Sequence, residues 1–186
     1  MSAIILIGGG VRSGKSAFAV ARARVLGDRR AFVATAQAFD DEMRTRIRDH
    51  RREREGDFTT FEEPLAIAAV LSGLDEFDVA VVDCLTLWLS NMLLEGQGAG
   101  AIAARVDELV AVLRARRAPT LLISNEVGMG IVPETPLGRA FRDLSGRMHQ
   151  AVAAAADEVH VAMMGVVLRL RPGPVEIARA HAGDAR

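Results

Sequence analysis

The sequence alternates short apolar runs with longer stretches in which apolar residues recur every three or four positions. The short runs predict strands at Ala3–Gly8, Ala31–Thr35, Val79–Asp83, Thr120–Ser124, Glu158–Met163 and Val166–Leu170. The longer stretches predict helices at Lys15–Leu26, Asp41–Glu55, Leu65–Leu74, Leu85–Leu94, Ala99–Arg116 and Leu137–Ala156. Strands that alternate with helices are typical of βαβ units, so we expect an α/β fold with a mostly parallel sheet and helices on both faces.

The composition is that of one globular domain, without an excess of charge of one sign or of hydrophobic residues. The chain has 186 residues, half of them hydrophobic, and a formal net charge of −1. A charge this close to zero argues against a nucleic-acid partner, and no apolar run approaches the roughly 20 residues of a membrane span. The single cysteine, Cys84, cannot form an intramolecular disulfide, and the N-terminus lacks a cationic signal-peptide start. We therefore expect a cytoplasmic protein, with a domain at 1–171 and a flexible tail at 172–186.

One segment matches the phosphate-loop pattern G-x-x-x-x-G-K-[ST]. It consists of Gly9, Gly10, Val11, Arg12, Ser13, Gly14, Lys15 and Ser16, between a predicted strand and a predicted helix. The glycines allow the backbone amides to face phosphate oxygens, and the helix adds the positive end of its dipole. Lys15, the only lysine among 23 basic residues, is expected to reach the terminal phosphates, and the Ser16 hydroxyl to ligate Mg²⁺. The segment predicts a nucleoside triphosphate site.

Two acidic residues end predicted strands. Asp83 follows the apolar run Val79–Val82, as a Walker B aspartate follows its strand to hold Mg²⁺. Glu126 follows the next apolar strand, at the edge where ligands bind in such sheets. We expect Asp83 to be a metal ligand, whereas Glu126 is either a residue that orients a nucleophile or metal-bound water, or a solvated loop acid.

Two other nucleotide-binding classes are disfavoured. The dinucleotide pattern G-x-G-x-x-G fails because Ser13 occupies the position of its third glycine. A GTPase switch would need D-x-x-G after a strand, but Asp143 and Gly146 lie in a helical pattern. The guanine-reading motif N-K-x-D is impossible because the only lysine lies in the phosphate loop.

A basic helix with a central histidine admits two interpretations. His50 shares a predicted helix face with Arg46 and Arg54, and the segment also contains several acidic residues. The first interpretation is a solvated helix with ion pairs. The second is a nucleophilic site: nearby cations favour the neutral imidazole, and the arginines would bind a transferred phosphoryl or nucleotidyl group.

The order and spacing of the motifs resemble a known family. The motifs are the phosphate loop, Ala34-Thr35-Ala36, Asp40-Asp41-Glu42-Met43, Arg46-Ile47-x-x-His50-Arg51, Asp83-Cys84-Leu85-Thr86-Leu87-Trp88, Asn91, Asn125-Glu126-Val127-Gly128-Met129-Gly130-Ile131-Val132-Pro133 and Gly138-Arg139-x-Phe141-Arg142-Asp143-x-x-Gly146. This set is similar to the bifunctional adenosylcobinamide kinase / adenosylcobinamide-phosphate guanylyltransferase family of cobalamin biosynthesis, over about residues 4–170.

The resemblance implies two reactions in one single-domain P-loop NTPase with a RecA-like sheet. The kinase phosphorylates the aminopropanol hydroxyl of adenosylcobinamide with ATP or GTP. The transferase attacks GTP with a histidine, matched here by His50, and passes GMP to the phosphorylated corrinoid. The positions that match guanine-nucleotide contacts are Ala34, Thr35, Ala36, Arg51, Arg52, Glu53, Arg54, Glu62 and Asp83. The resemblance also implies a homotrimer.

The sequence departs from the family pattern at two positions. Phe58 stands where tryptophan is common, and His149 stands where asparagine is usual. Two other functions remain open: a small-molecule P-loop kinase without guanylyl transfer, and a nucleotide-binding module that regulates a partner. The role of His50 distinguishes a kinase without guanylyl transfer from the bifunctional enzyme, since only guanylyl transfer needs a nucleophile at this position.

Overall fold

A single sheet forms the centre of the computed structural model, which describes residues 3–37 and 56–177. Its strands are β1 (Ile4–Gly9), β2 (Arg30–Ala34), β3 (Thr59–Glu62), β4 (Val79–Asp83), β5 (Thr120–Ile123), β6 (Glu158–Met163), β7 (Val166–Arg171) and β8 (Glu176–Ile177). The helices of the described residues are α1 (Lys15–Leu26), α3 (Ile67–Ser72), α4 (Leu85–Leu94), α5 (Ala99–Ala115) and α6 (Pro136–Ala155).

The strand order is β3-β2-β4-β5-β1-β6-β7-β8. The strands from β3 to β6 in this order are parallel to their neighbours, whereas β7 and β8 are antiparallel additions. Parallel strands end at the same edge of the sheet, so β1, β4 and β5 bring their carboxyl ends together. β5 lies between β1 and β4, which keeps the segment that follows it central at this edge.

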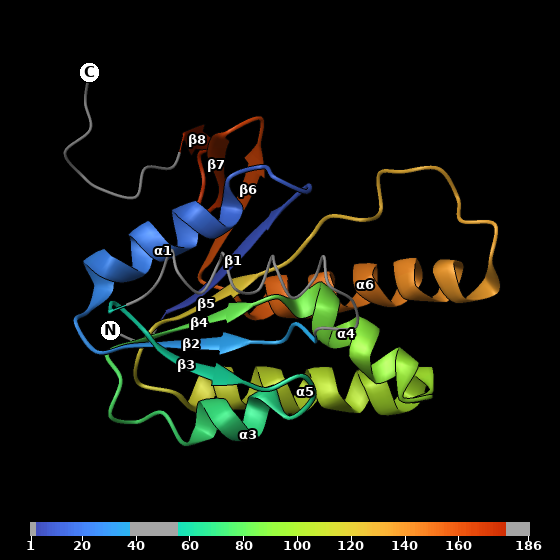
Figure 1. The fold of residues 1–186 in the computed structure, drawn as a ribbon. Coiled ribbons are helices and arrows are strands. Elements are labelled where there is room, and N and C mark those ends of the chain that lie inside the picture. Colours follow the sequence, from blue (N-terminus) through green and yellow to red (C-terminus); the bar gives the residue numbers. More distant parts are fainter. Residues whose placement is uncertain (1–2, 38–55, 178–186) are drawn as a thin grey trace.

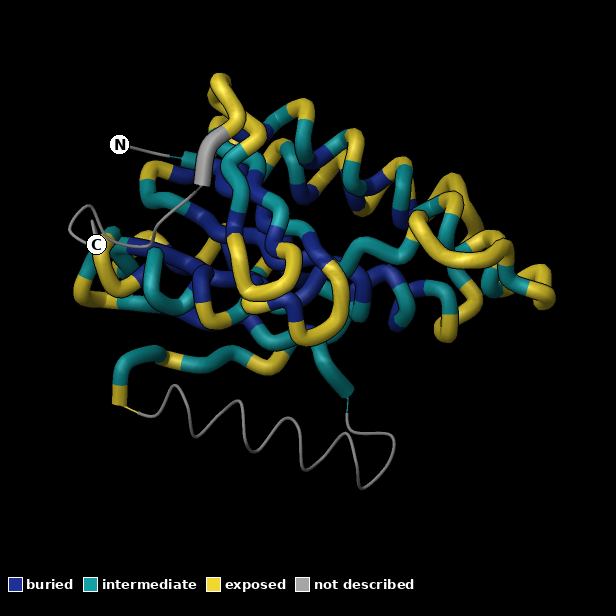
Figure 2. The backbone as a smooth tube through the Cα atoms, turned by 90° about the horizontal axis from the view of Figure 1, so that it is seen from above, coloured by how far each residue is buried: buried dark blue, intermediate teal, exposed yellow. Residues whose placement is uncertain are grey.

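Helices cover both faces of the sheet, as the alternation pattern predicts. In Figure 1, α1 lies on one face, and α3, α4, α5 and α6 lie on the other. Along β1, Ile4 and Leu6 belong to the core under α3–α6, whereas Ile5 and Ile7 belong to the core under α1. This alternation follows from the two-residue period of a strand, and it explains why β1 is apolar throughout. Figure 2 shows the buried segments crossing the middle of the molecule and the exposed ones in its loops and on the outer sides of its helices.

The predicted elements agree with the structure except at a few places. The expected helix Leu65–Leu74 is shorter, at Ile67–Ser72, and the Glu63 carboxylate accepts hydrogen bonds from the backbone amides of Leu65 and Ala66 just before it begins. Strand β3 was not predicted, because its exposed and half-buried positions lack an apolar run. Strand β8 lies in the segment for which we expected a tail. The predicted helix Asp41–Glu55 lies outside the described residues.

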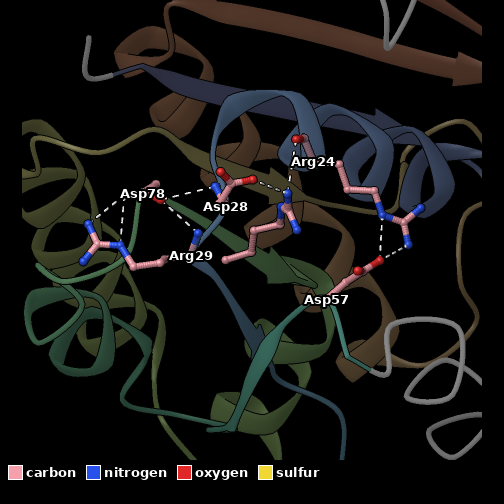
Figure 3. A network of polar contacts seen from close by, with 6 residues as sticks. Arg24, Asp28, Arg29, Asp57 and Asp78 are labelled. Atoms are coloured by element: carbon pink, nitrogen blue, oxygen red, sulfur yellow. Dashed lines mark hydrogen bonds and ion pairs between the residues drawn. The ribbon is translucent and has the colours of Figure 1, made fainter.

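Ion pairs connect loops at the edge of the sheet where β2 and β4 begin, opposite the carboxyl edge. Arg24 forms an ion pair with Asp57 at 2.6 Å, and Arg29 forms one with Asp78 at 2.8 Å (Figure 3). Asp78 also accepts hydrogen bonds from the backbone amides of Asp28 and Arg29. These contacts tie the turn before β2 to the residue before β4. They lower the pKa of Asp78 to about 2, mainly through the hydrogen bond from the Arg29 side chain.

None of the helices within residues 3–37 and 56–177 combines the length and the apolar character that a membrane crossing requires.

The ion pair of Asp78 predicts a pH-dependent contribution to stability. Because folding lowers the pKa of Asp78 from 3.8 to about 2, its contribution is present above about pH 4 and is lost as the pH falls toward 2. We expect Asp78→Asn to lower the urea midpoint at about pH 7, and the difference from wild type to narrow by about pH 3. Asp107→Asn, at an exposed position of α5, is the control and should leave the midpoint unchanged. An equal deficit at both pH values would contradict the ion-pair explanation.

Candidate active site at the carboxyl edge of the sheet

The phosphate loop connects the end of β1 to the start of α1. Gly9 ends the strand with φ of 147°, and Gly14 precedes the helix with φ of 98°. Both angles favour glycine, and a Cβ on Gly9 would also overlap the backbone oxygen of Ala162 in β6. The loop is supported from outside, because the Gly165 amide of the β6–β7 turn donates to the Ser13 carbonyl at 3.2 Å. The glycine spacing thus produces a tight loop that ends at a helix N-terminus.

Lys15 lies inside this loop. Lys15 is only 8% exposed, and its Nζ donates to the Gly10 carbonyl at 3.0 Å. Burial lowers the pKa of Lys15, and the nearby Asp83 and Cys84 act in the opposite direction. The only lysine of the chain therefore lies across the loop with a carboxylate beside it. Gly10, Val11, Arg12 and Gly14 are exposed, with Arg12 in the left-handed region at φ 54°.

Ser16 and Asp83 meet although 67 positions separate them. Ser16 Oγ donates to Asp83 Oδ2 at 3.1 Å, which joins the first turn of α1 to the end of β4. A hydroxyl and a carboxylate are oxygen ligands of the kind that Mg²⁺ prefers, and Mg²⁺ usually takes one or two protein ligands plus substrate phosphates. The pair therefore fits the predicted metal role, which needs no larger cluster of protein ligands. Asp83 is also level with Ala34 of β2, which pairs in turn with Glu62 of β3.

The predicted nucleotide contact Thr35 is fully buried. Its hydroxyl donates to the Cys84 carbonyl and accepts from the Cys84 amide, both at 2.8 Å. Its own carbonyl accepts from Asn91 Nδ2 at 2.8 Å, and Asn91 also donates to the Pro64 carbonyl. The side chain of Thr35 thus holds the end of β2 against the end of β4. Ala36 lies next to it and is half-buried.

A second polar cluster lies after β5, and the sequence analysis did not identify it as a unit. His149 of α6 contacts Ser124 Oγ through Nε2 at 2.6 Å, and its Nδ1 lies 3.8 Å from Glu126 Oε2. The Glu126 amide donates to the Gly9 carbonyl at 3.0 Å, which places this residue against the phosphate loop. The signal in the sequence was a histidine at a position where the family usually has asparagine, but its partners could be found only from the packing of α6.

Several predicted site residues cannot be placed. His50, Arg51, Arg52, Glu53 and Arg54 lie outside the described residues, so their predicted roles stay predictions. Among the described residues, the structure brings the phosphate loop, Ala34, Asp83 and Glu62 to one edge of the sheet.

The sheet and the phosphate loop define a P-loop nucleotide-binding protein with a RecA-like fold. The structure is similar to that of the RadB recombinase, with a TM-score of 0.50, 16% sequence identity and coverage of 96% of this chain and 82% of that one. At this identity, the likeness shows the fold alone, and it confirms the predicted fold class.

The family follows from sequence. A model of the CobU family, described as cobinamide kinase / cobinamide phosphate guanyltransferase, matches residues 5–170. The chain is 40% identical over 171 residues to the bifunctional adenosylcobalamin biosynthesis protein CobP of Pseudomonas aeruginosa, covering 91% of this chain and 98% of that protein. It is 36% identical over 183 residues to the bifunctional adenosylcobalamin biosynthesis protein CobU of Escherichia coli, covering 90% of this chain and 99% of that protein. The chain belongs to the cobinamide kinase / cobinamide phosphate guanyltransferase family, which confirms the resemblance.

The two glycines that begin the phosphate loop should differ in their tolerance of a side chain. We expect Gly9→Ala to lower the free energy of unfolding by about 1–3 kcal/mol, because the new Cβ would overlap the Ala162 carbonyl oxygen and the backbone lies at φ 147°. Gly10→Ala is the matched control, since nothing lies within 4 Å of its added Cβ, and it should stay within about 0.5 kcal/mol of wild type. Urea unfolding measures both. Equal stability of the two variants would contradict the close approach of β6 to the loop.

Proposed function

We propose that this protein phosphorylates adenosylcobinamide with ATP or GTP and then transfers GMP from GTP to the product, giving adenosylcobinamide-GDP. The observation that carries the proposal is the hydrogen bond between Ser16 and Asp83, which joins a phosphate loop to an acidic strand end. Family membership supplies the substrate class. A regulatory module without turnover is disfavoured, because the family is one of transferases.

In the kinase step, the loop amides and the N-terminus of α1 bind the phosphates of the donor nucleotide. Lys15 exchanges its contact with the Gly10 carbonyl for the transferred phosphoryl group, whose charge its ammonium stabilises. Ser16 and Asp83 would hold Mg²⁺, which neutralises charge on the phosphate oxygens when bound. The burial of Lys15 strengthens its interaction with the phosphates, since little water screens the ammonium.

In the transferase step, His50 attacks the α-phosphorus of GTP, and pyrophosphate leaves. The phosphorylated corrinoid then takes the GMP group from the histidine. Arg51, Arg52 and Arg54 would balance the charge of the transferred group, and Glu53, Glu62, Ala34 and Ala36 would contact the guanine nucleotide. Thr35, which is fully buried, would act by holding the end of β2 against the end of β4. The proposal for these residues rests on their match to the family motif.

The remaining features of the proposal also come from the family resemblance and the composition. We propose a cytoplasmic homotrimer that acts on small molecules, without a nucleic-acid partner. Size-exclusion chromatography with light scattering would test the oligomeric state.

Loss of the phosphate-loop ammonium should abolish phosphorylation. We expect Lys15→Ala to lower kcat/KM for adenosylcobinamide phosphorylation by about 10²–10³-fold, because an electrostatic contact to the transferred group is lost. The assay follows labelled γ-phosphate into the corrinoid. Arg105→Ala, in an exposed ion pair of α5, is the control and should retain the wild-type rate. Undiminished phosphorylation by Lys15→Ala would overturn the assignment of the phosphate loop.

Removal of the nucleophile should abolish the covalent guanylyl intermediate. With Mg²⁺ and GTP labelled at the α-phosphate, we expect the wild-type protein to keep label after denaturation and His50→Ala to keep none. The bond should be labile in acid and stable in base, as a phosphoramidate is. Label on both proteins would exclude His50 as the nucleophile, and label on neither would leave a kinase without guanylyl transfer.

A further inference from the structure

Glu126 occupies the central position of the carboxyl edge. Strand β5 lies between β1, which leads into the phosphate loop, and β4, which ends at Asp83. The segment after β5 is bound on both sides: the Glu126 amide donates to the Gly9 carbonyl at the end of β1 at 3.0 Å, and Asn125 Nδ2 donates to Thr86 Oγ1 in α4, the helix that follows β4, at 2.9 Å. The backbone of Glu126 is therefore held between the triphosphate-binding loop and the strand that ends at the predicted metal ligand, and its carboxylate has no role in the mechanism described so far.

The carboxylate of Glu126 has a defined orientation. Its Oε1 accepts a hydrogen bond from the Gly128 amide, which leaves Oε2 on the side of His149. The side chain is 35% exposed, so it is supported by protein contacts and still open to a substrate. This is the arrangement expected of a group that exchanges a proton with a bound molecule.

His149 adds a second support to this carboxylate. Burial lowers the pKa of His149, opposed by the charge of Glu126, so the imidazole is neutral near pH 7. In the tautomer that lets the Ser124 hydroxyl donate to Nε2, the proton lies on Nδ1, which is the nitrogen nearer Glu126. The 3.8 Å between Nδ1 and Glu126 Oε2 is longer than a hydrogen bond. A small movement of the carboxylate would bring the two atoms within hydrogen-bond distance. Among the described residues, Glu126 is the charged group that acts on this imidazole.

We propose that Glu126 is the general base of the phosphorylation step and that His149, fixed by Ser124, is its positioning residue. The inference rests on the proposed kinase function. As the substrate hydroxyl oxygen bonds to the γ-phosphorus of the donor, the bond from that phosphorus to the β-bridging oxygen breaks. The electron pair leaves with the nucleoside diphosphate, and the hydroxyl proton passes to the Glu126 carboxylate. Guanylylation of a neutral histidine involves no such hydroxyl proton, so this step does not need Glu126.

The two half-reactions therefore provide the test. We expect Glu126→Gln to lower kcat for adenosylcobinamide phosphorylation by about 10²–10⁴-fold, with KM for both substrates unchanged, because amide and carboxylate have the same shape. Guanylylation of the enzyme by α-labelled GTP should persist at the wild-type level. Glu126→Asp keeps a base on a shorter side chain and should recover part of the rate. Thermal unfolding of each variant confirms that the proteins compared are folded.

His149 is tested by removal and rescue. His149→Phe removes both ring nitrogens and should lower the phosphorylation kcat by about tenfold without changing KM or guanylylation. His149→Asn should restore most of the rate, because its amide nitrogen occupies about the position of Nδ1. A purely structural role of His149 predicts instead that His149→Asn and His149→Phe lower the phosphorylation kcat equally.

Other outcomes would overturn the assignment. A wild-type phosphorylation rate for Glu126→Gln would exclude Glu126 as the general base. Equal loss of both half-reactions would assign Glu126 a role in the fold or in nucleotide binding. Recovery of the Glu126→Gln rate at raised Mg²⁺ concentration would make it a support for the metal instead. Failure of the proposed function itself is distinct, because the wild-type protein would then phosphorylate no corrinoid.

Discussion

The hydrogen bond between Ser16 and Asp83 depends on the register of three parallel strands. Ile7 of β1 pairs with Ile123 of β5, and Ile123 pairs with Asp83 of β4. A slip of one residue would turn the Asp83 side chain to the other face of the sheet, away from α1. The fully buried isoleucines oppose such a slip, since it would exchange the two hydrophobic cores. The apolar packing of the sheet thus sets the geometry of the proposed phosphate and metal site.

Buried polar groups hold the ends of the strands together where the apolar core stops. Thr35 satisfies both backbone groups of Cys84, and Asn91 reaches from α4 to the carbonyls of Thr35 and Pro64. Unpaired backbone groups at this depth would destabilise the fold by about 1–3 kcal/mol each. These side chains therefore keep the edge ordered without contributing a charge to it.

Local patterns predicted much of this arrangement, and long-range packing explains what they missed. The phosphate loop and its adjoining strand and helix were predictable because glycine spacing and apolar periodicity act within a few residues. Asp83 was predictable as a strand end, but its contact with Ser16 required the sheet order. The pairing of His149 with Ser124 and Glu126 joins α6 to β5, and no periodicity encodes it. Strand β3 was missed for a related reason, since it is stabilised by pairing with β2 rather than by an apolar run.

The topology also bears on how one domain would serve two transfers. Strand β2 ends at Ala34, level with Asp83, and the chain re-enters the described structure at Gly56 before the parallel strand β3. The connection that contains His50 therefore leaves the sheet from the edge that carries the phosphate loop. The proposed nucleophile His50 belongs to this connection, whereas Glu126 is bound within the edge through its backbone amide. In the proposed mechanism, phosphorylation uses groups positioned by the sheet, and guanylyl transfer would add a group from the connection between β2 and β3.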